Sequence, residues 1–324
     1  MSSTTPDPHE IDRCDAFDEP DRREFLKGGA FLAASARPAV SSSPMPEAKA
    51  GPLLPTVSFG RHRITRMIAG ANPIYGYSHF NRLLDDQFRE YHSTERVLDF
   101  LRNLERAGVN TWQASWSERL ENDWPKYKDQ GGKLQLLVLS RPQFNDTPEI
   151  LPRVMKLKPL GIAQHGSRTN QYWEEGQIDK SVDYLKRIRD TGAMVGFSGH
   201  NPREIEYAEE KGWPVDYYMT CLYYMNRSRE SLAKLLGEAP LGEVYLPSDP
   251  AKMMATVRQA KKPCLAYKVF AAGRTINSPQ QIRQSLATAL TGIKPTDAVI
   301  VGMYQRLSDQ IGQNTQFVRE ILGS

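Results

Sequence analysis

From residue 56 onward, short apolar runs alternate with segments in which apolar residues recur at helical spacing. Glycine or proline separates most of these segments, which is typical of strands that alternate with amphipathic helices. Eight strands are predicted, at residues 64–71, 109–115, 134–140, 160–166, 194–200, 215–222, 263–270 and 297–303.

Helices are predicted between and after these strands. The helix at 93–108 opens with the capping residue Ser93, and the helix at 201–212 has Asn201 as its N-cap, followed by Pro202. Further helices are predicted at 178–192, 278–292 and 307–322, with a short one near 148–157 and one or two within 227–262.

Eight strand–helix pairs between residues 56 and 324 fit a (β/α)₈ TIM barrel, and a doubly wound open sheet is the alternative. The barrel is preferred because no GxGxxG motif follows the first strand. In TIM barrels the active site is built from the loops that follow the carboxyl ends of the strands. Candidate chemistry is therefore expected at those strand ends.

The N-terminal segment DRREFLKGGAFLAASARPA resembles a twin-arginine export signal, because the run RREFLK matches the core motif in order and spacing. The resemblance implies a signal at residues 1–36, with Ala34-Ser35-Ala36 as a cleavage site. It also implies the twin-arginine translocase as a partner and a periplasmic or other extracytoplasmic location. A disordered basic N-terminus is the alternative. Residues 37–55, rich in proline, serine and alanine, are interpreted as a linker to a barrel at 56–324.

The composition narrows the class of protein. The formal net charge of +4 is too small to indicate nucleic-acid binding, and no apolar run is long enough for a membrane span. The three cysteines form no CxxC pair, so a cysteine-ligated zinc site is not expected. Their odd number also argues against a scaffold stapled by disulfides.

Polar, aromatic and basic residues gather at the predicted strand ends, and they suit a hydroxylated or anionic small molecule such as a sugar derivative. His165 follows the apolar run LGIAQ and is interpreted as functional, and His200 stands in SGHNP before a helix. These two histidines and Glu118 are the only obvious metal ligands, and no metal site is predicted because a catalytic zinc needs three protein ligands. Lys268 is a candidate for acid/base or imine chemistry if its side chain points inward, where desolvation would lower its pKa.

Several strings together resemble the aldo-keto reductase family. They are AGVNTWQAS, GIAQHG, VGFSGHNPREIEYAEEKG, LAYKVFAAGR and DAVIVGMYQRLSDQIGQN, in the family's order and spacing from about residue 56 to residue 320. The resemblance implies a (β/α)₈ barrel that reduces carbonyl groups with NADPH.

The family's four catalytic residues are an aspartate, a tyrosine, a lysine and a histidine. Placed on this chain by the resemblance, they fall on Gln113, Glu118, Arg141 and His165 in that order. Only the histidine is kept, so the usual relay that protonates the carbonyl oxygen is absent. Tyr75 or Tyr77 from the first loop, or Lys268, is proposed to replace the proton donor.

The resemblance also implies residues that hold NADP(H). Tyr267 matches the residue that stacks on the nicotinamide, and Ser198 matches a contact to its carboxamide. Asn314 matches a residue at the adenine end, and Arg306 could meet the 2′-phosphate.

Three functions are left open at this stage. The first is an exported, NADP(H)-dependent oxidoreductase that acts on a sugar-like carbonyl or alcohol. The second is a cofactor-free lyase, isomerase or hydrolase of sugar-like substrates, and the third is a non-catalytic binding barrel.

Overall fold

The computed structural model describes residues 44–324, so the predicted signal at 1–36 and the first part of the predicted linker lie outside the described residues. The strands are β1 (Thr56–Phe59), β2 (His62–Thr65), β3 (Met67–Gly70), β4 (Thr111–Ser115), β5 (Gln135–Leu139), β6 (Gly161–Gln164), β7 (Met194–Gly199), β8 (Tyr217–Cys221), β9 (Cys264–Tyr267) and β10 (Ala298–Gly302).

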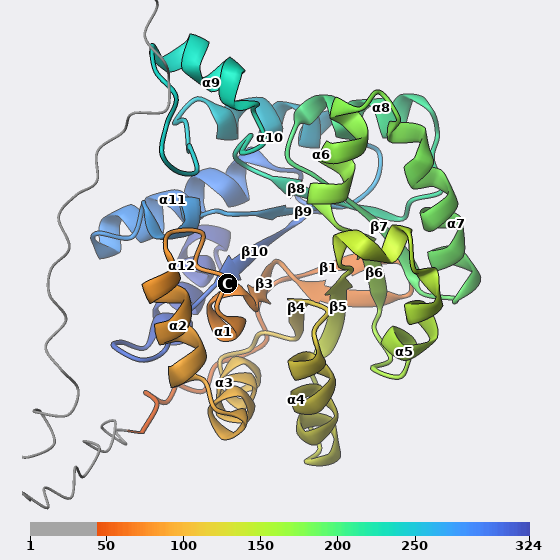
Figure 1. Cartoon of the computed structure of the whole chain (residues 1–324). Coiled ribbons are helices and arrows are strands. Elements are labelled where there is room, and N and C mark those ends of the chain that lie inside the picture. The colour runs from red at the N-terminus through yellow and green to blue at the C-terminus, as the bar shows by residue number, and fades with distance from the viewer. Residues whose placement is uncertain (1–43) are drawn as a thin grey trace, which may run out of the picture. The chain divides into compact units, whose positions relative to one another are not determined.

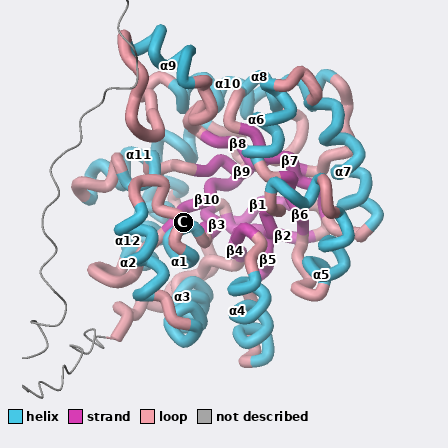
Figure 2. Tube along the Cα trace, viewed as in Figure 1, coloured by secondary structure: helices cyan, strands magenta, loops and turns pink. Residues whose placement is uncertain are grey.

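Eight parallel strands close into a barrel in the order β10-β3-β4-β5-β6-β7-β8-β9. Closure is made by the pairing of β10 with β3, for example Ile300 with Ile68. The strands lie inside a ring of helices (Figures 1 and 2). The predicted (β/α)₈ barrel is thus confirmed, each of the eight predicted strands contains one barrel strand, and the doubly wound alternative is wrong.

Each helix that was predicted with bounds is present, and four further helices lie at 72–75, 82–91, 118–129 and 166–174. Ser93 caps one helix by accepting a hydrogen bond from the backbone of Arg96, and Asn201 forms a capping box with Glu204 at another. The helices are α1 (Asn72–Tyr75), α2 (Arg82–Tyr91), α3 (Thr94–Arg106), α4 (Glu118–Asp129), α5 (Leu151–Met155), α6 (Gly166–Glu174), α7 (Ser181–Asp190), α8 (Pro202–Glu210), α9 (Arg229–Leu236), α10 (Asp249–Gln259), α11 (Pro279–Gly292) and α12 (Gln310–Leu322).

An antiparallel hairpin, β1–β2, precedes the barrel and was not predicted. The predicted strand at 64–71 therefore breaks in two, because Ile64 ends the hairpin core and Met67 begins the barrel. The hairpin turns at Gly60, whose φ of 57° suits glycine. Phe59 and Ile64 are fully buried and pack against residues inside the barrel, with the Phe59 and Tyr217 ring centroids 4.9 Å apart. The hairpin thus closes the amino-terminal end of the barrel and leaves the carboxyl-terminal end free for a site.

Residues 45–55 of the predicted linker pack against the barrel. Met45, Ala48 and Leu54 are buried there, and the backbone of Leu54 bonds to the carbonyl oxygen of Gly108. This part of the chain therefore belongs to the folded unit, which begins before the predicted residue 56.

Candidate functional site

An elongated cavity of about 580 Å³ opens at the carboxyl-terminal end of the barrel. It begins at Gln113 and Tyr267 and reaches Gln313 and Asn314 on α12. Residues after β3, β9 and β10 form its walls, and α2 covers it from one side. The cavity thus extends well beyond the barrel opening, which we call the mouth.

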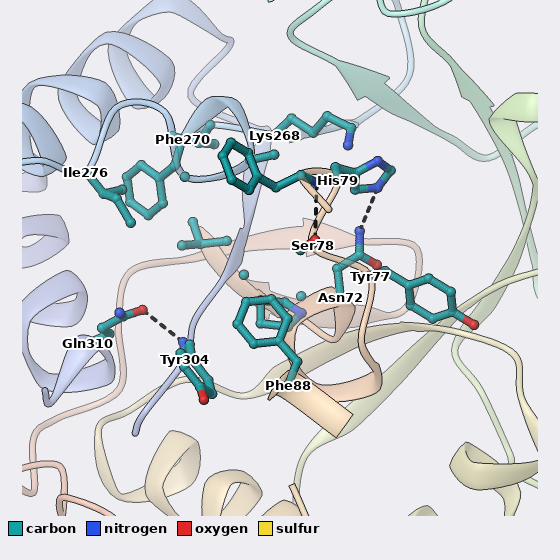
Figure 3. A pocket seen from close by; sticks show the side chains of 18 of the residues that line it. Asn72, Tyr77, Ser78, His79, Phe88, Lys268, Phe270, Ile276, Tyr304 and Gln310 are labelled. Carbon is teal, nitrogen blue, oxygen red and sulfur yellow. Dashed lines mark hydrogen bonds between the residues drawn. The ribbon is translucent and has the colours of Figure 1, made fainter. Parts of the chain in front are cut away.

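The lining of this cavity varies in polarity along its length. Figure 3 shows His79 and Lys268 at one end, and Phe88, Phe270 and Ile276 away from them. The cavity therefore combines a polar end at the mouth with a mainly apolar body.

The polar end is organised around His79. Its Nδ1 lies 2.9 Å from a carboxylate oxygen of Glu243, and its Nε2 lies 3.4 Å from the amide nitrogen of Asn72. Tyr245 donates a hydrogen bond to the other Glu243 oxygen, and Lys268 Nζ lies 3.5 Å from the Tyr245 hydroxyl. Both oxygens of the Glu243 carboxylate are therefore engaged by protein groups.

Backbone strain is concentrated at this site. His79, Lys268 and Ala272 all line the cavity and have φ values of 56°, 61° and 52°. The left-handed region is unfavourable for residues with a side chain, and such strain persists only where the surroundings impose it. The sequence left open whether the Lys268 side chain points inward. The structure answers this, because Lys268 lines the cavity.

The two histidines at the mouth are neutral hydrogen-bond donors. His165 Nδ1 accepts a bond from the Ser167 backbone, and His200 Nδ1 lies 3.0 Å from the Asn170 side-chain nitrogen. Since Nδ1 is an acceptor in both rings, the proton of each neutral ring is on Nε2. Burial, with smaller contributions from nearby Arg141 and Lys268, lowers the pKa of His165 to about 4 and that of His200 to about 3.

The predicted catalytic residues do not all come together. Gln113 and Lys268 line the cavity. His165 follows β6 as the N-cap of α6 and lies near Arg141, and neither of these two residues lines the cavity. Glu118 is instead the first residue of α4, with an exposed side chain that does not line the cavity.

The structure separates the two candidate tyrosines. Tyr77 lines the cavity, and its hydroxyl accepts a hydrogen bond of 3.0 Å from Arg141 Nη1. Tyr75 is buried against Trp112, and its hydroxyl faces Asp123. Tyr77 is therefore the tyrosine placed to meet a ligand.

Three of the four predicted cofactor residues are associated with the cavity. Tyr267 and Asn314 line it, and the Ser198 hydroxyl lies 3.2 Å from that of Tyr267. Arg306 is exposed beside Tyr91 and does not line the cavity.

The sequence analysis missed Glu243, Tyr245 and Arg274. The Arg274 guanidinium lies 4.1 Å above the Tyr245 ring and donates to the backbone carbonyl of His79. Glu243 and Tyr245 follow α9 in a stretch without strand or helix, so no periodic pattern marked them.

The chain should lose stability as the pH falls from 6.5 towards 4. His92, His165 and His200 have lowered pKa values, chiefly through burial, so the unfolded chain binds more protons in this window. The buried Glu204, whose pKa is raised to about 7, acts in the opposite sense but is outnumbered. Urea midpoints at pH 7 and pH 5 measure the loss. His200→Gln, which cannot be protonated, should show a smaller loss, and an equal loss would contradict the assignment.

Within residues 44–324, no helix is both long and apolar enough to cross a membrane. Among the same residues, no group of three or more histidine, cysteine, aspartate or glutamate side chains is arranged to hold a metal ion. Cys221 and Cys264 are buried free thiols.

No protein-family model matches the chain, and no curated protein matches it. Among solved structures, apo Gox0644 is similar at 9% identity and a TM-score of 0.49, with 83% of this chain and 93% of that chain covered. Dihydropteroate synthase from Thermus thermophilus is similar at 9% identity and a TM-score of 0.45, with 83% and 99% covered. Phospho-2-dehydro-3-deoxyheptonate aldolase from Thermotoga maritima is similar at 13% identity and a TM-score of 0.46, with 84% and 71% covered. These likenesses are too weak to bear on activity.

Proposed function

We propose that this barrel is an oxidoreductase of aldo-keto reductase type, which uses NADP(H) to interconvert a sugar-like carbonyl compound and its alcohol. The observation that supports this most is the reach of the cavity from Tyr267 at the mouth to Asn314 on α12. A substrate bound only at the mouth would not contact the end of the cavity at Asn314. A dinucleotide is long enough to use both ends.

The residues present fit such a cofactor. Asn314 is only 3% exposed and lines the cavity, and no hydrogen bond between described residues uses its side-chain amide. The Asn314 amide at the cavity wall is therefore free to bond to a ligand. In this proposal Tyr267 and Ser198 hold the nicotinamide end, Asn314 the adenine end, and Arg306 the 2′-phosphate from outside the cavity.

The bound cofactor would supply or accept the hydride, and side chains of the protein would transfer the proton. The Nε2–H group of His165 is available to orient the carbonyl oxygen. Tyr77 would give its proton to that oxygen, and the phenolate left behind would be stabilised by the Arg141 guanidinium that bonds to it. Gln113 cannot carry charge, so Arg141 takes over the stabilising role without a carboxylate beside it.

Cofactor-free acid/base chemistry is the second candidate, and the His79–Glu243 contact of 2.9 Å favours it. A carboxylate that fixes an imidazole is a common arrangement for a general base. In this alternative the barrel would be a lyase, isomerase or hydrolase, with Lys268 as a further acid/base group. A binding barrel without activity is the third possibility.

The deciding experiment is a fluorescence titration of the folded chain with NADPH, after a check for nucleotide released on denaturation. We expect binding in the micromolar range, weakened at least fivefold by Asn314→Ala, since a buried hydrogen bond is worth about 1 kcal/mol or more. Asn277→Ala, at an exposed site outside the cavity, is the matched control. No binding at millimolar NADPH, with none released, would reject the oxidoreductase. Turnover of a keto sugar without cofactor would then support the second candidate.

We further propose that the twin-arginine segment exports the folded chain out of the cytoplasm, so that a tightly held cofactor travels with it. Fractionation of cells that express the chain with Arg22 and Arg23 intact tests this location. Recovery from the cytoplasm alone would reject it.

A further inference from the structure

Positive charge is in excess at the polar end of the cavity. Lys268 and Arg274 both line it, and neither has a carboxylate of a described residue within ion-pair distance. Glu243 is the carboxylate whose charge acts on Lys268, but its two oxygens contact His79 and Tyr245, so two positive charges face one negative charge. We call Lys268 and Arg274 the cationic pair.

The two cations lie close enough to repel each other. Burial is the main cause of the lowered pKa of Lys268, the charge of Glu243 partly offsets it, and the charge of Arg274 lowers it further. A partly desolvated ammonium group without a carboxylate at ion-pair distance is costly, and the left-handed backbone of Lys268 adds to that cost. An arrangement that is costly in the free protein points to a compensating charge in the complex.

The neighbouring neutral groups also donate rather than accept. The proton of His200 is on Nε2, and Lys268 is close enough to influence the His200 pKa. Lys268 has three N–H bonds, and only a long contact of 3.5 Å to Tyr245 uses one of them. The site therefore offers donors to a ligand that supplies only acceptors.

We propose that the cationic pair binds the carboxylate of an acidic sugar, while Tyr77 and Arg141 face its reacting carbonyl or hydroxyl. The claim that the acidic sugar is a substrate rests on the proposed function. The claim that it binds at this site can be tested without cofactor or turnover. The substrate class is then a sugar acid, in which one end carries the charge and the other end reacts.

The test is calorimetric titration of the folded chain at low ionic strength with D-glucuronate, D-glucose and D-glucose 6-phosphate. Glucuronate and glucose differ by a carboxylate in place of a hydroxymethyl group, so we expect glucuronate to bind at least tenfold more tightly. Added salt should weaken the binding of glucuronate and leave the binding of glucose unchanged. Equal affinity for the two sugars would overturn the proposal, and tighter binding of the phosphate would overturn the choice of a carboxylate.

Variants assign the effect to the pair. Lys268→Gln and, independently, Arg274→Gln should each remove most of the advantage of glucuronate over glucose while leaving NADPH affinity within threefold. Lys186→Gln, on the exposed face of α7, is the matched control for net charge. A loss of NADPH affinity in place of glucuronate affinity would overturn the proposal, because the cations would then serve the cofactor's phosphates. Normal glucuronate binding without NADPH binding would reject the oxidoreductase and keep the carboxylate site.

Discussion

Replacement of Tyr77 by phenylalanine should lower kcat for the proposed carbonyl reduction by about 100-fold or more, the usual contribution of a positioned general acid. The hydroxyl is the only group removed, and Arg141 Nη1 donates a hydrogen bond of 3.0 Å to it. The aromatic ring remains, so NADPH affinity should stay within about twofold. Single-turnover measurements with saturating NADPH separate the chemical step from binding.

Tyr75→Phe is the matched control for this variant. Tyr75 lies two residues away, at the end of α1, but it packs against Trp112 in the core, and its hydroxyl faces Asp123 instead of the cavity. Its removal should leave kcat within about threefold. Equal losses in the two variants would indicate a disturbed loop, and an unchanged kcat in Tyr77→Phe would assign the proton to another group.

The barrel could be predicted from sequence because its signals are local. Each predicted strand is an apolar run ended by glycine, proline or a polar residue, and each is long enough to contain the strand that forms. The caps at Ser93 and Asn201 are equally local, since a side chain there bonds to a backbone group two or three residues away. Neither signal requires knowledge of what lies across the barrel.

The remaining features depend on contacts between distant residues. Nothing near Phe59 in the sequence shows that its ring contacts Tyr217, about 160 residues later in the chain. The sequence therefore predicted one strand at 64–71 where the structure has the end of the hairpin and the first barrel strand. The contact between Glu243 and His79 likewise spans 164 residues. The direction of the Lys268 side chain depends on a positive φ, and a lysine in the sequence does not indicate a positive φ.

The catalytic positions that the resemblance implies differ in how firmly the barrel fixes them. His165 follows β6 directly and Gln113 lies within β4, so both positions are set by the barrel. Glu118 lies beyond β4, at the start of a helix, where a small change in the loop turns a side chain outward. The tyrosine role therefore passes, in our proposal, to Tyr77 in a different loop, because Arg141 reaches it.

Replacement of Phe59 by alanine should lower the free energy of unfolding by about 3–5 kcal/mol, the usual cost of truncating a buried aromatic ring. Phe59 is fully buried beside Tyr217, at the end of the barrel opposite the cavity. A closed barrel cannot contract around the gap without breaking its own strand pairing, so the cavity left behind should persist.

Urea denaturation measures this loss as a lower midpoint with an unchanged slope. Leu53→Ala is the matched control, because that side chain is 58% exposed and its truncation should cost about 0.5 kcal/mol or less. NADPH affinity of the folded Phe59 variant should be unchanged, since the hairpin and the cavity lie at opposite ends of the strands. A loss below about 1 kcal/mol would mean that the hairpin does not hold the barrel closed, and a coupled loss of affinity would mean that its packing reaches the mouth.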